Sequence, residues 1–349
     1  MVRFYLILGI ICSSWAWAEN TSYYLSPEAQ AMGNALTAIA SDDQALFYNP
    51  AALAEVKNWS LRPIALTLVG SSDLLKTGQS LSSLKNATIN DLNSFLNKNL
   101  YAQAQVTSSF VMPGFGIALI NHDDARLHLQ NPSFPQGYLG YQAIQGVQVG
   151  FGTKMLSFDQ RKGVLNFGMA AKVLRQKGSI ISITLTDVMT TDPSALLNQV
   201  NSDGSTGYGL DLGFQGIYRL TKRLKLLTSL SYTDIGNTSF RTTALEGSFT
   251  GGMALQYRSR DAVTTLAYDY SNILDNLDWR KKNHFGLRLQ LDWLSFLVGI
   301  NQIYFTYGLA VKFGLVQLMY ASYAEAWGPL VHQNPQRNQV LQASFKITW

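Results

Sequence analysis

Cysteine is nearly absent from this 349-residue sequence, in which Cys12 is the only one. Residues 1–18 have the features of a signal peptide: one arginine, an apolar run over residues 4–11, and an Ala-Trp-Ala site at residues 16–18. We therefore expect Cys12 to leave with this peptide. The exported chain is expected to have no disulfide and no thiol nucleophile, although its compartment permits disulfides.

Charge is scarce too: charged residues make up 14% of the sequence, whereas a soluble protein usually carries about 25%. After the signal peptide, no apolar run reaches the roughly 20 residues that a membrane-spanning helix needs. In an exported chain rich in aromatic residues and glycine, these absences indicate a transmembrane β-barrel. A secreted β-sandwich or solenoid is the alternative from composition alone. The net charge of +5 is spread along the chain, so it gives no indication of nucleic-acid binding.

Apolar and polar residues alternate with a period of two along many segments. Between Tyr208 and Leu220, one face is mostly apolar and the other carries Asp211, Gln215 and Arg219. Such a strand fits a barrel wall with lipid outside and a polar lumen inside. The charged residues assigned to the lumen have both signs: Asp211, Arg219, Lys225, Arg258, Asp269, Arg288, Asp292 and Lys346.

Fourteen segments have the length and pattern of strands. Their ranges are 59–70, 101–112, 114–122, 138–157, 163–176, 206–220, 224–236, 247–258, 261–272, 283–292, 293–301, 303–313, 315–323 and 338–349. Long and short connections alternate between them, as in barrels with long outer loops and short periplasmic turns. The sequence thus predicts an all-β fold: a transmembrane antiparallel up-and-down β-barrel of about 14 strands over residues 59–349, with both termini periplasmic.

The stretch before the barrel, residues 19–58, is too short and too weakly apolar to bury a core of its own. Asn49-Pro50 predicts an extended chain over residues 46–48, an N-cap at Asn49 and a short helix from Pro50. Ser26-Pro27 repeats this device, and Gly33 is placed to end the first helix. We expect this segment to be a hatch inside the barrel lumen.

Short motifs in the predicted hatch resemble those of one family of outer-membrane proteins. The motifs are Ala31-Met32-Gly33, Ala38-Ile39-Ala40, Asp42-Asp43 and Asn49-Pro50-Ala51 followed by Leu53. They are similar to the N-terminal hatch of the long-chain fatty-acid transporter family, which includes transporters of aromatic hydrocarbons. The resemblance implies a fourteen-stranded barrel, a hydrophobic small-molecule ligand, and a hatch motif made of Gly33, Asp42, Asp43, Asn49, Pro50 and Ala51.

Two other features leave a different function open. The stretch Gly207–Gly213 and Asp234-Ile235-Gly236 resemble relatives in the same superfamily that act as shuttle or scaffold barrels of secretion or conjugation systems. A non-transporting scaffold is therefore the alternative. The last strand ends at Trp349 and resembles the signal that the barrel assembly machinery reads, so this machinery is an expected partner.

For a transporter, we expect hydrophobic molecules to be collected by the outer loops and released sideways into the membrane. Gly146, Gly150 and Gly152 lie on an unusually long predicted strand and are candidates for the gap in the wall, because glycine within strands marks bulges and bends. Packing of small residues against lumen side chains is the alternative. The outer loops 71–100 and 177–205 have helical character. Their candidate ligand contacts, which could instead only cap the barrel, are Leu92, Phe95, Leu96 and Leu196.

The sequence gives little support for catalysis, a cofactor or a metal. Its one dense cluster, His122-Asp123-Asp124 with His128, is predicted on an outer-loop rim. Adjacent strand residues point to opposite faces, so His122 and Asp123 do not converge, and no ligand spacing indicates a metal. We expect a monomeric, non-enzymatic barrel in the outer membrane of a Gram-negative cell, in contact with lipid and lipopolysaccharide. A general diffusion porin is a third possibility.

Overall fold

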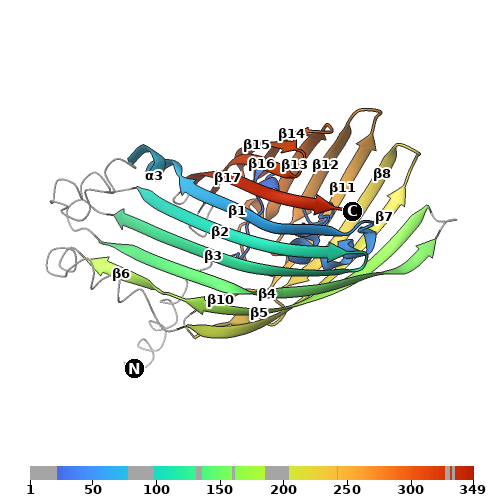
Figure 1. Cartoon of the computed structure of the whole chain (residues 1–349). Coiled ribbons are helices and arrows are strands. Elements are labelled where there is room, and N and C mark those ends of the chain that lie inside the picture. Colours follow the sequence, from blue (N-terminus) through green and yellow to red (C-terminus); the bar gives the residue numbers. More distant parts are fainter. Residues whose placement is uncertain are drawn as a thin grey trace, which may run out of the picture.

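The computed structural model describes residues 22–77, 98–130, 136–158, 162–184, 204–241, 243–326, 331 and 335–349. Fourteen antiparallel strands form a closed barrel in which nearly every strand pairs with its neighbours in the sequence (Figure 1). The first strand pairs with the last, and the ring is complete. The predicted strand number and up-and-down order are confirmed. The predicted signal peptide and Cys12 lie outside the described residues.

The barrel strands are β1 (Ser60–Ser71), β2 (Asn99–Met112), β3 (Phe115–Gln130), β4 (Gln136–Phe158), β5 (Gly163–Lys177), β7 (Ser205–Arg219), β8 (Leu224–Thr233), β11 (Ser248–Arg258), β12 (Val263–Tyr270), β13 (Asn283–Gln290), β14 (Leu294–Asn301), β15 (Tyr304–Phe313), β16 (Val316–Ala326) and β17 (Pro335–Thr348). A short strand, β6 (Ile180–Thr184), pairs with the outer end of β4. A small hairpin, β9 (Thr238–Ser239) with β10 (Ala244–Leu245), lies between β8 and β11 in the sequence.

The wall is taller on one side than on the other. Strand β4 has 23 residues, whereas β12, β13 and β14 have 8 each. The prediction that β3 ends at His122 and that residues 123–137 form a loop is wrong. Strand β3 continues to Gln130, because β2 and β4 pair with it on both sides. His122, Asp124 and Arg126 share the strand face that lines the lumen, and residues 131–135 separate β3 from β4 in the sequence.

The outer surface of the barrel is apolar. One row crosses five neighbouring strands, and its exposed members pair in register: Leu255, Leu266, Leu287, Val298 and Tyr307. Leu266 is 55% exposed. A continuous apolar row on the outside of a closed barrel is the surface that lipid chains contact.

The inner surface next to this row carries small residues. Ala254, Ala267, Gly286 and Gly299 pair in register across β11 to β14, and both alanines are buried. Residues 22–58 fill the space that these side chains leave, and Figure 1 shows their helices inside the ring of strands. We call residues 22–58 the lumen segment.

The lumen segment has three short helices: α1 (Pro27–Ala31), α2 (Gln44–Tyr48) and the 3-10 helix η1 (Pro50–Glu55). The caps are as predicted, with Ser26 accepting from the Ala29 N–H and Asn49 from the Ala51 N–H. The extended chain predicted over residues 46–48 is wrong. Only Asn49 is extended (φ −160°, ψ 100°), because proline restricts only the residue before it.

Outside the lumen segment, the described ranges contain two helices, α3 (Ser72–Thr77) and η3 (Trp279–Lys282). None of the helices in the described ranges is long and apolar enough to cross a membrane.

The two ends of the described chain lie at different ends of the barrel. Trp349 exchanges backbone hydrogen bonds with Trp59 at the end where the short turns lie, and their rings are 6.3 Å apart. Ser22, the first described residue, lines a cavity towards the long connections. Trp349 thus lies at the short-turn end, whereas the predicted position of the N-terminus concerns residues outside the described ranges.

The apolar row predicts how the barrel responds to charge. We expect Leu266→Arg to lower the free energy of unfolding in lipid by about 2–4 kcal/mol, because the guanidinium lies against the acyl chains. Leu315→Arg, in the turn between β15 and β16, is the control and should cost no more than about 1 kcal/mol. Reversible urea unfolding in lipid vesicles measures both, and equal costs would show that the row lies outside the membrane.

Candidate functional site

The candidate site is the lumen segment together with the barrel wall that holds it. Asn49 is fully buried at the corner between α2 and η1. While its side-chain oxygen caps η1, its amide donates to the Phe214 carbonyl on β7 at 3.1 Å and to the Thr37 carbonyl at 3.4 Å. The Asn49 side chain thus joins three parts of the structure: the start of η1, the chain at Thr37 and strand β7 of the wall.

Glycines in the wall make this close approach possible. A Cβ on Gly213 would lie 2.0 Å from the Asn49 side-chain oxygen, and a Cβ on Gly168 would lie 2.3 Å from the Ala51 nitrogen. On the opposite wall, Gly286 and Gly299 leave the same kind of space for Met32 and Gly33. Gly33 has φ +64°, a left-handed conformation that favours glycine.

Acidic residues of the lumen segment pair with basic residues of the wall. Asp43 accepts a 2.6 Å hydrogen bond from Arg62 on β1, and both side chains are buried. Asp42 pairs with Lys346 on β17. Glu28 pairs with Arg288 on β13. The wall residues Arg288 and Lys346 were predicted to face the lumen, whereas Arg62 was missed.

A buried carboxylate of the wall also holds backbone of the segment. Asp269 on β12 accepts from the Leu36 N–H at 2.9 Å and from the Thr37 N–H at 2.7 Å. On β13, His284 Nδ1 donates to the Gly33 carbonyl at 2.9 Å. Removing one partner of a buried ion pair such as Asp43–Arg62 costs about 3–5 kcal/mol, because the other charge is left without compensation. The segment is therefore fixed around its perimeter by groups from β1, β7, β12, β13 and β17.

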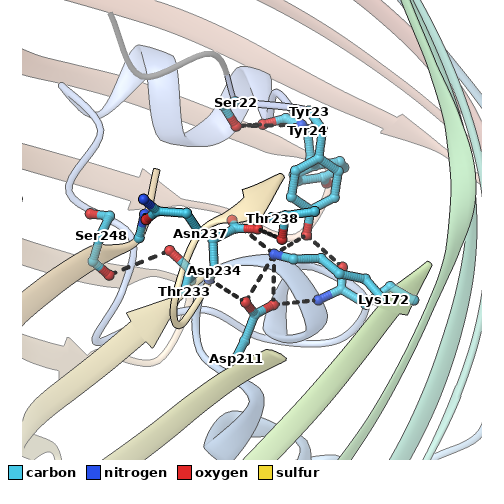
Figure 2. Close-up of polar contacts among 12 residues, drawn as sticks. Ser22, Tyr23, Tyr24, Lys172, Asp211, Thr233, Asp234, Asn237, Thr238 and Ser248 are labelled. Atoms are coloured by element: carbon cyan, nitrogen blue, oxygen red, sulfur yellow. Dashed lines mark hydrogen bonds and ion pairs between the residues drawn. The ribbon is translucent and has the colours of Figure 1, made fainter. Parts of the chain in front are cut away.

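A buried lysine of the wall, Lys172, forms a further polar contact with the lumen segment (Figure 2). Lys172 on β5 has a fully buried side chain that lies 2.9 Å from Asp211 on β7 and 2.9 Å from Asp234 after β8. Tyr23 of the lumen segment lies over the ammonium, 4.6 Å from ring centre to nitrogen, and its hydroxyl donates to Gln148 on β4. Burial raises the pKa of the Tyr23 phenol, so it stays a protonated donor.

Sequence reasoning placed Asp211 in the lumen but missed Lys172. The sequence nevertheless indicates this residue, because Lys172 is the only charged residue in the apolar stretch from Val164 to Leu174. A lone lysine in an otherwise apolar strand indicates a paired position, because lysine is almost never fully buried without a partner.

Gly146, Gly150 and Gly152 all face the lumen. The ladder of β4 with β3 and β5 is continuous through Gly146 and Gly150, and with β5 through Gly152. The irregularity of β4 lies between Lys154 and Leu156 instead. A Cβ on Gly150 would lie 2.6 Å from Leu46, and one on Gly152 would lie 2.7 Å from the Pro50 carbonyl. Gly150 and Gly152 thus accommodate the lumen segment, whereas a Cβ on Gly146 would meet the Val173 carbonyl of the neighbouring strand β5 at 2.2 Å. The wall beside all three is closed.

A cavity of about 770 Å³ lies between the lumen segment and the long connections. Four aromatic residues of the segment line it: Tyr23, Tyr24, Phe47 and Tyr48. Tyr24 stacks on Phe47 with ring centres 3.7 Å apart, and Tyr23 meets Phe47 edge-on. The wall of the cavity is more polar, and its charged and histidine residues are His122, Asp124, Arg126, Asp234, Glu246, Asp275, Lys281, His284 and Glu325.

The cluster predicted on a loop rim lies within β3. His122 Nε2 is 3.5 Å from Asp124, which also accepts from Arg126 at 2.8 Å. His122 and Asp124 share the lumen face, and Asp123 points the other way, as the strand period requires. Among the residues that the structure describes, no group of three or more potential ligands is arranged to hold a metal ion. The candidate ligand contacts Leu92, Phe95, Leu96 and Leu196 lie outside the described ranges.

No protein-family model and no curated protein matches this sequence. Solved structures do match its fold. The TodX deltaS2S3 mutant, a monoaromatic hydrocarbon channel, has 12% sequence identity and a TM-score of 0.52, over 93% of this chain and 98% of that one. This chain has the barrel fold of TodX.

Two further channels were also found. The toluene transporter TodX of Pseudomonas putida has 12% identity and a TM-score of 0.47, over 93% of this chain and 97% of its own. CymD, a monoaromatic hydrocarbon channel, has 11% identity and a TM-score of 0.48, over 95% of this chain and 99% of its own. At these identities the likeness to TodX concerns the fold alone.

The glycine contacts predict a way to displace the lumen segment. We expect Gly168→Ala to push Pro50 and Ala51 away from β5, because the new methyl group meets backbone atoms that cannot move independently. The control is Gly251→Ala, whose Cβ would make ordinary contacts of 3.5 Å or more. Limited proteolysis of the assembled barrel should cut within residues 22–58 much faster in Gly168→Ala than in the control. Equal cutting in both variants would contradict the packing described here.

Proposed function

We propose that the protein is an outer-membrane barrel that moves hydrophobic small molecules across the membrane, with the lumen segment as a hatch. The observation that carries this proposal is the combination of a lumen filled by its own N-terminal segment and a cavity with an aromatic floor directly on that segment. A ligand in the cavity touches the element that must move. A volume of about 770 Å³ also lies within the roughly 300–1,000 Å³ of small-molecule sites.

The barrel fold shared with a monoaromatic hydrocarbon channel supports this proposal. The floor supports it as well, because stacked aromatic rings favour apolar and aromatic ligands. The filled lumen speaks against a general porin, whose channel is filled with water. In the proposed orientation, the long connections face outwards and the short turns face the periplasm. Contact with lipid and lipopolysaccharide, assembly through the strand ending at Trp349, and a monomeric state belong to the same proposal.

The proposed route follows the glycine-lined inner face of β4. When the hatch moves, Leu46 and Pro50 leave Gly150 and Gly152 and expose wall without side chains. Lateral release then requires the backbone pairs of β4 near Gly146–Gly152 to separate. Few lumen side chains have to be displaced there, so these glycines remain the proposed exit.

The first test separates transport from structure. We expect Asn49→Ala to lower the uptake of radiolabelled toluene several-fold while the amount of assembled barrel stays the same, because the hatch loses its corner but the strands keep their pairing. Asn58→Ala, an exposed residue at the end of the lumen segment, is the matched control and should transport normally. Assembly is read from the heat-dependent shift of the barrel in gels. Loss of assembly in Asn49→Ala would show that this residue is structural.

The second test addresses the hatch directly. In planar bilayers we expect little conductance from the native protein and frequent openings from Asp43→Asn, because Arg62 then remains buried without its counter-charge. Asp278→Asn removes a charge in the connection between β12 and β13 and should stay closed. Large stable openings of the native protein would instead identify a porin and overturn the proposed function.

A further inference from the structure

Three basic residues lie side by side at the short-turn end of the barrel. Arg219 pairs directly with Lys225 across β7 and β8. Arg258 is the last residue of the next strand, β11, and its N–H donates to Arg223 in the β7–β8 turn. Each of the three shares its strand face with buried residues, such as Gln215, Ser229 and Ala254 respectively. All three therefore face the lumen rather than the lipid. We call Arg219, Lys225 and Arg258 the basic row.

The basic row has no counter-charge of its own. In the described parts of the chain, no ion pair or side-chain hydrogen bond involves any of the three. Arg219, Arg258 and Lys57 repel the Lys225 ammonium, and Glu55 attracts it. Asp261 and Asp292 line a shallow pocket together with Arg258 and Arg260, without an ion pair to Arg258. Like charges opposite one another on neighbouring strands are destabilising. The turn beside the row adds two more exposed cations, Lys222 and Arg223.

The opposite end of the lumen, around the cavity, is acidic rather than basic. Acidic residues outnumber basic ones along the cavity, with Asp124, Asp234, Glu246, Asp275 and Glu325 against Arg126 and Lys281. An anion is therefore attracted to the short-turn end of the lumen and not to the cavity. The basic row, which no hatch contact uses, is accessible there, since Arg219 and Arg258 are exposed and Lys225 is half-buried.

We propose that the basic row is a docking site for an acidic segment of a water-soluble protein on the periplasmic side. Neighbouring strands are about 4.8 Å apart, so three cations on three strands form a line of roughly 10 Å. A run of carboxylates along an extended peptide matches such a line, whereas a single small anion contacts only part of it. Lipid headgroups approach from the outer face of the wall, away from these side chains. This site is separate from the hatch and its cavity, and only its assignment to the periplasmic side rests on the orientation given under the proposed function.

The test uses the full barrel in nanodiscs of neutral phosphatidylcholine and a fluorescein-labelled peptide of eight glutamates. We expect the native protein to bind the peptide, with affinity falling as salt increases. The variant Arg219→Gln/Lys225→Gln/Arg258→Gln should bind about ten-fold more weakly, because three charge-assisted contacts are lost. The control Lys76→Gln/Arg241→Gln/Arg280→Gln removes three cations outside the short-turn end and should bind as the native protein does. Heat-dependent gel shifts confirm that both variants are assembled.

Two results would overturn the proposal. Equal peptide binding by the basic-row variant and the native protein, or no binding by either, would show that the row is not a docking site for acidic chains. The second arm repeats the titration in nanodiscs that contain phosphatidylglycerol. If the anionic lipid abolishes binding to the native protein, the row is a lipid headgroup site. Unchanged binding supports docking of a protein segment.

Discussion

The closed lumen depends on close contact between backbone and backbone. Met32, Gly33, Pro50 and Ala51 lie against wall positions where even a methyl group would not fit. The wall can supply this space because inward side chains in a barrel alternate with outward ones, so glycine and alanine inside coexist with leucine and tyrosine outside. The lumen segment is thereby held without a core of its own, and the lipid-facing surface is unaffected.

Charged side chains of the wall also hold the lumen segment in place. Its acidic residues meet arginine and lysine on β1, β13 and β17, and Asp269 receives two of its backbone N–H groups. These contacts lie around a perimeter and each can break separately, in contrast to the apolar packing between them. In the proposed function, the lumen segment is the element that a ligand bound on its aromatic upper face displaces. The polar network of Lys172 and Tyr23 lies at the junction between the cavity and the segment.

Local patterns in the sequence predicted much of the fold and less of the site. Period-two alternation identified all fourteen strands, and Asn49-Pro50 identified a cap that the structure shows. The end of β3 was misjudged, because polar residues lie on both of its faces, with His122 and Asp124 inside and Asn121 and Asp123 outside. The stretch therefore lacks the alternation that indicates a strand. The wall partners of the segment could not be assigned, since Leu36 and Asp269 are 233 residues apart. Register and closure decide such pairs, and neither is a property of a local stretch.

The central claim is that residues 22–58 are a fixed part of the closed barrel. Hydrogen exchange followed by mass spectrometry, on the native protein in lipid nanodiscs, tests it most directly. We predict that the amides of Leu36, Thr37 and Ala51, which bond to Asp269 and Asn49, exchange as slowly as amides within the barrel strands. Exchange at the rate of exposed connections would contradict it, because the lumen segment would then be free of the wall.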